Sequence, residues 1–244
     1  MPTVPSRQDL SQRELLQPPS LRSGFNHLYQ QPLVASESAS DLCIEKTRFP
    51  RLSGKNVLLV LDTEDAVEVG VLGKTVEDGL AIGSKCIRDH ASVVEVRQVY
   101  NEQGVKVLAN RIQAMVNFAS QNQERNQTED VGNVIIGAIQ GYVRTAKRDG
   151  SGAAFEILTL YNATTGEIAQ SVSDGVPLQA EYLIEAREKD ITYGSVLDPI
   201  FSKAAQEKYG YDLHIANDWS KAICGQTRRK RLLAAAGDLK CVFT

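Results

Sequence analysis

Cysteine and histidine are scarce in this chain, and neither sign of charge dominates it. The four cysteines form no Cys-x-x-Cys pair and the three histidines are scattered, which argues against a structural zinc site and a disulfide framework. The net charge of −3 excludes the global positive field that attracts nucleic acid or anionic lipid. No apolar run approaches the roughly 20 residues of a membrane-spanning helix. The first ten residues, MPTVPSRQDL, lack the apolar centre of a secretory signal. We therefore expect a cytoplasmic protein without a bound metal ion, a transmembrane segment or a nucleic-acid partner.

Proline is also unevenly distributed. Residues 1–52 hold six of the eight prolines and are rich in Ser and Gln, so they bury little apolar surface and are expected to form a disordered tail. The remaining residues, 53–244, suit one medium-sized domain. Hydrophobic residues make up 42% of the chain, enough for a core.

Strand and helix patterns alternate along this domain. Continuous or alternating apolar runs predict strands at 56–61, 66–72, 92–99, 133–143 and 155–161, with turns at 62–65 and 162–167 and a polar loop at 121–130. Apolar residues at helical spacing predict helices at 75–90, 104–120, 178–188 and 218–236, and a loop with a short helix at 193–206. The mixture indicates a layered α/β domain.

Two short motifs near the first strand have a chemical interpretation. Asp62 and Glu64 follow an apolar strand, as the first carboxylates of a two-metal 3′–5′ exonuclease would. The later His214-to-Asp218 spacing is one residue too short for that enzyme, so we prefer an acidic turn. Gly73-Lys74-Thr75 would begin a helix, and the free N–H groups of a helix N-terminus can bind phosphate. The second glycine of a P-loop is absent, however.

The end of the chain carries a basic run and a cysteine. Residues 228–231 (Arg-Arg-Lys-Arg) would fan around a helix, mostly as a solvated face. Cys241 begins a loose C-a-a-X prenylation pattern with Phe243 and Thr244 in disfavoured positions. Trp219, the single tryptophan, is expected to pack in the core.

Three segments, read in order, resemble one superfamily. Residues 107–112 (VLANRI) are similar to its G-A-x-N-R-A helix, with Asn110 and Arg111 matching fully. Residues 138–143 (AIQGYV) resemble its G-I-E-G-G-V strand end, and residues 218–229 (DWSKAICGQTRR) resemble a W-x-x-A-x-x-G-x-[ST]-R-R signature. The superfamily is the non-canonical purine NTP phosphatases, of the inosine/xanthosine triphosphatase type. The branch that looks most similar is the C-terminal domain of eukaryotic proline-rich, coiled-coil-containing proteins.

This resemblance implies a three-layer α/β/α domain with an elongated mixed sheet, a nucleotide cleft and homodimers. Active members use Mg²⁺ and open with a [ST]-x-N-x-x-K loop after the first strand. The best alignment keeps Thr63 but places Asp65 at the Asn and Glu68 at the phosphate-binding Lys, and it makes Ala66 onward a helix. A later alignment places Lys74 at the Asn and Glu77 at the Lys. Either way the lysine position changes sign, which repels a triphosphate.

A second departure concerns the metal. Gln140 stands where the resemblance places a metal-supporting Glu, and an amide oxygen holds magnesium less well than a carboxylate. We therefore expect no catalytic residues and no cofactor, with Mg²⁺ needed only if the chain is an active phosphatase. The expected ligand contacts, which could hold a residual nucleotide, are Thr63, Lys74, Arg111, Thr227, Arg228 and Arg229.

The expectation is a catalytically degenerate nucleotidase fold that serves as a binding or regulatory scaffold. Through the resemblance it implies association with the Golgi and early secretory pathway and with the regulatory subunit of protein kinase A. The alternatives are an active inosine/xanthosine triphosphatase and the exonuclease.

Overall fold

The apolar run that follows Lys55 forms the first strand of a mixed sheet. The structure, a computed structural model, describes Phe49 and residues 52–92, 98–101, 103–122, 128–146, 150–209 and 219–239, without the side chains of 202–209 and 222. The predicted tail, apart from Phe49 and Leu52, lies outside the described residues, as do His214, Asp218 and Cys241.

Six strands form the sheet. They are β1 (Asn56–Leu61), β2 (Cys86–His90), β3 (Val131–Thr145), β4 (Gly152–Asn162), β5 (Ile168–Val172) and β6 (Val176–Leu178). The order is β2-β1-β3-β4-β5, and β6 also pairs with β4. β1 runs parallel to both of its neighbours, whereas β4 is antiparallel to β3, β5 and β6. The predicted α/β class is confirmed, with a mixed sheet.

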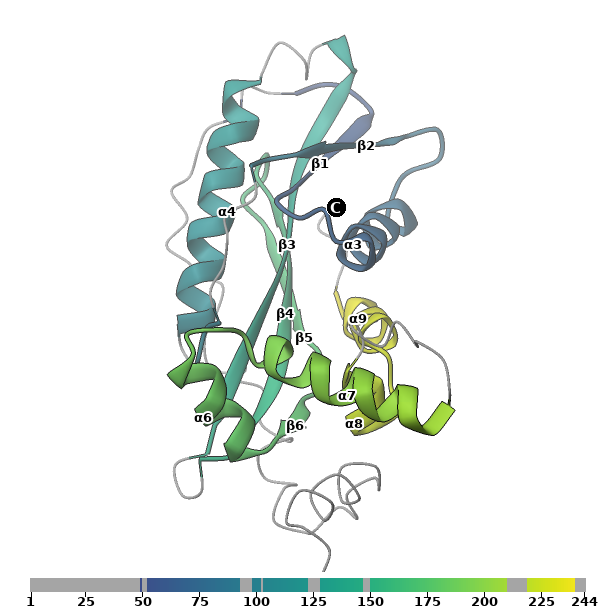
Figure 1. Ribbon diagram of the computed structural model, residues 1–244. Helices are drawn as coiled ribbons and strands as arrows, with labels where there is room; N and C mark the ends of the chain where they lie inside the picture. The colour runs from purple at the N-terminus through teal and green to yellow at the C-terminus, as the bar shows by residue number, and fades with distance from the viewer. Residues whose placement is uncertain are drawn as a thin grey trace, which may run out of the picture.

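Helices cover both faces of this sheet (Figure 1). Successive side chains of a strand point to opposite faces, so Leu58 and Val60 of β1 pack toward α4 (Gln103–Gln121), while Leu59 and Leu61 pack toward α3 (Ala66–Asp78) and α9 (Arg228–Gly237). A third apolar cluster joins one end of β3 and β4 to α6 (Ala180–Glu188), α7 (Tyr193–Tyr209) and α8 (Trp219–Cys224).

The predicted strand at 66–72 and the predicted helix at 75–90 are both wrong. Residues 66–78 form one helix, α3, and residues 86–90 form the edge strand β2. Alternating valines suggested a strand, but the same residues also place Val67, Val71 and Leu72 on one helical stripe. The side chain of Asp65 decides between the two, because it accepts hydrogen bonds from the backbone N–H groups of Val67 and Glu68 and so caps the helix.

The predicted helix at 104–120 is confirmed by α4, and the helix at 178–188 by α6. β3 and β4 confirm the strands at 133–143 and 155–161 and extend them, and the turn at 162–167 is also confirmed. The segment 193–206, expected to hold only a short helix, belongs to the 17-residue helix α7. Residues 93–97 of the predicted strand at 92–99 and residues 123–127 of the polar loop lie outside the described residues.

The continuous helix predicted over 218–236 is wrong. α8 ends at Cys224 and α9 begins at Arg228. Gly225 lies between them with φ +75°, a left-handed conformation that glycine adopts readily, and it ends α8. The Thr227 hydroxyl then accepts a hydrogen bond from the N–H of Lys230 and caps α9. The break places Arg228 in the first turn of a new helix.

Candidate functional site

A buried polar network lies between the end of β1 and α4. Asp62, the residue after β1, is only 3% exposed, and its carboxylate accepts two hydrogen bonds from Arg111 of α4, at 2.6 and 2.7 Å. Arg111 also donates to the side-chain oxygen of Gln140 at 3.0 Å and to the Ile139 carbonyl at 2.9 Å. The Gln140 side-chain nitrogen donates to the Gly141 carbonyl. Both ends of the Gln140 amide are therefore held by the protein itself.

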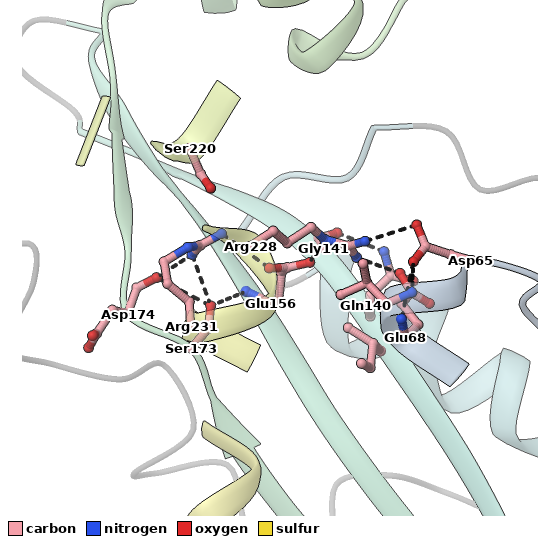
Figure 2. Close-up of polar contacts among 12 residues, drawn as sticks. Asp65, Glu68, Gln140, Gly141, Glu156, Ser173, Asp174, Ser220, Arg228 and Arg231 are labelled. Carbon is pink, nitrogen blue, oxygen red and sulfur yellow. Dashed lines mark hydrogen bonds and ion pairs between the residues drawn. The ribbon is translucent and has the colours of Figure 1, made fainter. Parts of the chain in front are cut away.

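A second network, on the α3 and α9 face, centres on Arg228 (Figure 2). Arg228 Nε donates to Glu156 of β4 at 2.6 Å, one terminal nitrogen donates to Glu68 of α3 at 2.5 Å, and the other donates to Asp65 at 3.1 Å. A guanidinium group presents several donors in a rigid plane, so it can bind carboxylates in several directions at once. One arginine thus ties together three segments that lie far apart in the sequence.

Arg231, one turn along α9, completes this network. Its side chain is 4% exposed and donates to the second Glu156 oxygen at 3.2 Å and to the Asp174 carbonyl at 2.7 Å. Its Nε is buried without a hydrogen-bond partner among the residues that the structure describes. We call Asp65, Glu68, Glu156, Arg228 and Arg231 the Arg228 cluster, which holds three carboxylates and two guanidinium groups and so carries one net negative charge.

Burial shifts the acid–base equilibria of this cluster. Burial raises the pKa of Glu68 above its ordinary value of 4.5, and Arg228 only partly offsets that effect. Burial alone would lower the pKa of Arg228, but the carboxylates of Glu156 and Glu68 outweigh it and raise that pKa. Burial also raises the pKa of Tyr193, which lies within electrostatic range of Glu156 and both arginines. Glu68 is therefore easier to neutralise than an exposed glutamate.

The described residues leave Gly141, a neighbour of Glu156, uncovered. Gly141 of β3 pairs with Glu156 across the sheet, and a Cβ built on Gly141 would meet no atom of the described residues within 4 Å. Gly137, four residues earlier and hence on the same face of the strand, is instead tightly covered, because its Cβ would lie 2.9 Å from Leu61. Within the part of the chain that the structure describes, the α3 and α9 face is thus covered at Gly137 and uncovered at Gly141.

The predicted ligand contacts separate into four places. Arg111 joins the network of Asp62, on the α4 face, while Arg228 centres the cluster on the other face. Thr63 lies beside that cluster, because its hydroxyl accepts a hydrogen bond from the N–H of Asp65. Thr227 caps α9 next to Arg228. The structure thus brings Thr63, Thr227 and Arg228 toward one site.

Lys74 and Arg229 lie elsewhere. Gly73-Lys74-Thr75 does not open a helix as predicted, because it lies in the middle of α3, where backbone N–H groups are already bonded. Lys74 forms an exposed ion pair with Asp78. Arg229 is exposed on α9. The predicted solvated face of residues 228–231 is correct for Arg229 and Lys230 but wrong for the two arginines of the cluster.

Two central members of the cluster were missed by sequence reasoning. Glu156 is a single charge within the apolar strand β4, and a charge in such a run signals a buried partner. Arg231 was assigned to the solvated run. Trp219, expected in the core, is partly buried and meets Tyr193 edge-on, with 5.1 Å between ring centroids.

The carboxylates proposed for an exonuclease do not converge. Asp62 is held by Arg111, and Glu64 is exposed. Among the described side chains, no group of three or more His, Cys, Asp or Glu is arranged to hold a metal ion. No helix in the described ranges has both the length and the apolar character to cross a membrane.

Comparisons with known proteins give no family. No protein-family model matches the chain, and no curated protein matches it. A crystal structure of protein VC0702 from Vibrio cholerae is similar at 12% identity and a TM-score of 0.44, covering 73% of this chain and 89% of the other. The PelC dodecamer from Paraburkholderia phytofirmans has 13% identity and a TM-score of 0.22, covering 63% and 93%. At these scores neither neighbour supports a conclusion about family or function.

Proposed function

We propose that this chain is a non-catalytic protein of the inosine/xanthosine triphosphatase type, a three-layer α/β/α domain that serves as a binding or regulatory scaffold. The observation that carries the proposal is the position of Glu68, whose carboxylate accepts a hydrogen bond from Arg228. The alignment that equates Glu68 with the phosphate-binding lysine requires a helix from Ala66 onward, and α3 begins at that residue. The alternative alignment would place the loop around Lys74, inside the helix.

Charge in this cluster opposes binding of a triphosphate. An incoming phosphoryl group would have to compete with Glu68, Glu156 and Asp65 for Arg228. At an effective dielectric constant of 20, two like charges about 5 Å apart repel by about 3 kcal/mol. A lysine in place of Glu68 would contribute attraction of similar size. Exchanging that lysine for a glutamate therefore weakens triphosphate binding strongly.

The residues that would support a magnesium ion fit it poorly. The Gln140 side-chain oxygen accepts from Arg111, so it is not directed toward an ion, and Glu156 is shared by two arginines. Guanidinium groups near a site disfavour a second cation by repulsion. We assign no catalytic step to this donor set.

Hydrolysis of inosine triphosphate tests the proposal. Full-length protein with Mg²⁺ should release no phosphate above the level of a heat-inactivated control. Lys74→Ala should give the same result, since Lys74 is exposed and paired with Asp78. Clear turnover by the wild type, abolished by Lys74→Ala, would establish the active phosphatase instead. No observation favours the exonuclease, because Arg111 binds Asp62.

The partners we propose rest on the resemblance alone. They are a second copy of this chain, the regulatory subunit of protein kinase A and a residual nucleotide, at a Golgi or cytoplasmic location. Light scattering on the full-length protein would measure the oligomeric state. Direct binding of purified regulatory subunit would test the partner, and saturable binding absent from bovine albumin is the expected result. A monomer that binds no regulatory subunit would leave the scaffold without its proposed partners.

A further inference from the structure

Three carboxylates on one arginine are more than charge balance requires. Asp65 precedes α3, Glu68 lies in its first turn and Glu156 lies in β4, whereas Arg228 begins α9. Glu156 already has a second partner in Arg231, so Glu68 and Asp65 add negative charge to an arginine that Glu156 also holds. Asp65 and Glu68 each accept a hydrogen bond from one terminal nitrogen of Arg228.

Two further features concern the described surroundings of the cluster. The side chain of Arg231 is 4% exposed, and its Nε has no hydrogen-bond partner among the described residues, although donors in such positions are usually satisfied. Gly141 pairs with Glu156, and a Cβ at Gly141 would touch no atom in the ranges that the structure describes. Gly141, on the same face of the sheet as Glu156, is therefore not covered by the described residues.

We propose that Glu68 and Asp65 form an autoinhibitory contact, an internal competitor that keeps Arg228 from phosphoryl or similar anions, and that neutralising Glu68 weakens this competition at one edge of the arginine while Asp65 and Glu156 keep their bonds to it. This inference rests on the proposed function, because it explains how a non-catalytic site would be regulated. With Glu68 neutral, the cluster loses its net negative charge, and one edge of Arg228 is held only by a neutral group.

Glu68 is a member of the cluster whose pKa is raised by burial. The groups that face it are Arg228 from α9, Asp65 from the α3 cap and Glu156 from β4, two anions and one cation. Burial and, to a smaller extent, the two anions raise the pKa of Glu68, and together they outweigh the lowering effect of Arg228. Asp65 is less suited to this role, since it is half exposed and also caps α3.

The test is binding of inorganic tripolyphosphate to the full-length protein, measured by calorimetry at low salt and pH 7.5. Glu68→Gln removes the charge and keeps a hydrogen-bonding oxygen for Arg228. We expect it to bind at least about tenfold more tightly than the wild type, as expected for removal of one unit charge at short range. The matched control is Glu77→Gln, a substitution in the same helix at an exposed residue paired with Arg88. It should change affinity less than about twofold, because exposed charges are screened.

Two further measurements make the result decisive. Adding Arg228→Gln to Glu68→Gln should abolish the gain, and wild-type affinity should rise as pH falls from 7.5 toward 4.5 more than that of Glu68→Gln. Equal affinity of Glu68→Gln and the wild type, or a gain that survives Arg228→Gln, would overturn the autoinhibitory contact. Phosphate release from inosine triphosphate would overturn the proposed function instead, so the two failures are distinguishable.

Discussion

Replacing Arg228 by alanine should leave the buried carboxylate of Glu68 without its counter-charge. In the intact protein Arg228 is the cation bonded to this carboxylate, whose side chain is 13% exposed. Glu156 would keep Arg231, and Asp65 is 45% exposed and would be hydrated. The main cost of Arg228→Ala is therefore one buried carboxylate without its counter-charge.

The size of this cost follows from the burial of the pair. Removing one partner of a buried ion pair costs roughly 3–5 kcal/mol. Arg228 is 25% exposed, so water screens part of the interaction and we expect the lower end, about 3 kcal/mol in the free energy of unfolding. In a domain of this size that corresponds to a fall in Tm of about 6–12 °C.

Lowering the pH should reduce the difference in the free energy of unfolding between the wild type and Arg228→Ala. The pKa of Glu68 is already above 4.5 in the folded protein, and loss of Arg228 removes the attraction that lowers it, so it rises further. A carboxyl group with a raised folded-state pKa binds protons more readily in the folded than in the unfolded state, so folding is favoured as pH falls. The penalty of Arg228→Ala should be largest above the folded-state pKa and shrink as pH falls toward 4.5.

Urea titrations of the full-length protein, followed by circular dichroism at pH 7.5 and 5, measure this penalty. Arg229→Ala is the matched control, because that arginine is exposed one residue away and should change stability by less than about 0.5 kcal/mol. Adding Glu68→Gln to Arg228→Ala should restore part of the loss. A loss below about 1 kcal/mol at pH 7.5, or one that grows toward pH 5, would refute the reasoning.

Two further predictions concern the sheet and its other face. Arg111→Met should lower the free energy of unfolding by about 3–5 kcal/mol, because it leaves Asp62 buried without a cation, and Asp62→Asn in the same background should recover part of it in the same urea assay. Gly137→Ala should cost about 1–3 kcal/mol through overlap with Leu61, whereas Gly141→Ala should be within about 0.5 kcal/mol of the wild type. Equal losses in the two glycine variants would contradict an open space at Gly141.

Sequence patterns predicted the interior of the fold better than its edges. The apolar pattern fits only a strand in β3 and β4 and only a helix in α4, and all three elements were predicted. β2, β5 and β6 have five residues or fewer, and β2 (CIRDH) shows no apolar alternation. Edge strands take their structure from pairing with a neighbour, which is a tertiary effect that local pattern does not contain. α3 was misread because its valines fit both periods.

The residues of the candidate site also fall into those that the sequence indicated and those that it did not. Glu68, Gln140 and Arg228 were recognised through the resemblance, but nothing in the sequence indicated which residues they contact. Glu156 and Arg231 are 75 positions apart, and their meeting depends on the break between α8 and α9. A one-residue shift in the register of β4 would move Glu156 to the α4 face. Long-range ion pairs of this kind require the sheet register, which the sequence alone does not specify.

The two polar networks belong to neighbouring residues of one strand. Gln140 contacts Arg111 of α4 on one face, and Gly141 pairs with Glu156, which binds Arg228 on the other. Buried ion pairs contribute little net stability compared with apolar side chains of similar size, because desolvation offsets their attraction. A gain in net stability is therefore no reason for charges on both faces of the sheet at this level. On the α4 face the side-chain polar atoms of Asp62, Arg111 and Gln140 are all paired, whereas among the described residues the Arg228 cluster keeps one unpaired buried donor, Arg231 Nε. Any ligand of this domain should therefore be sought on the α3 and α9 face.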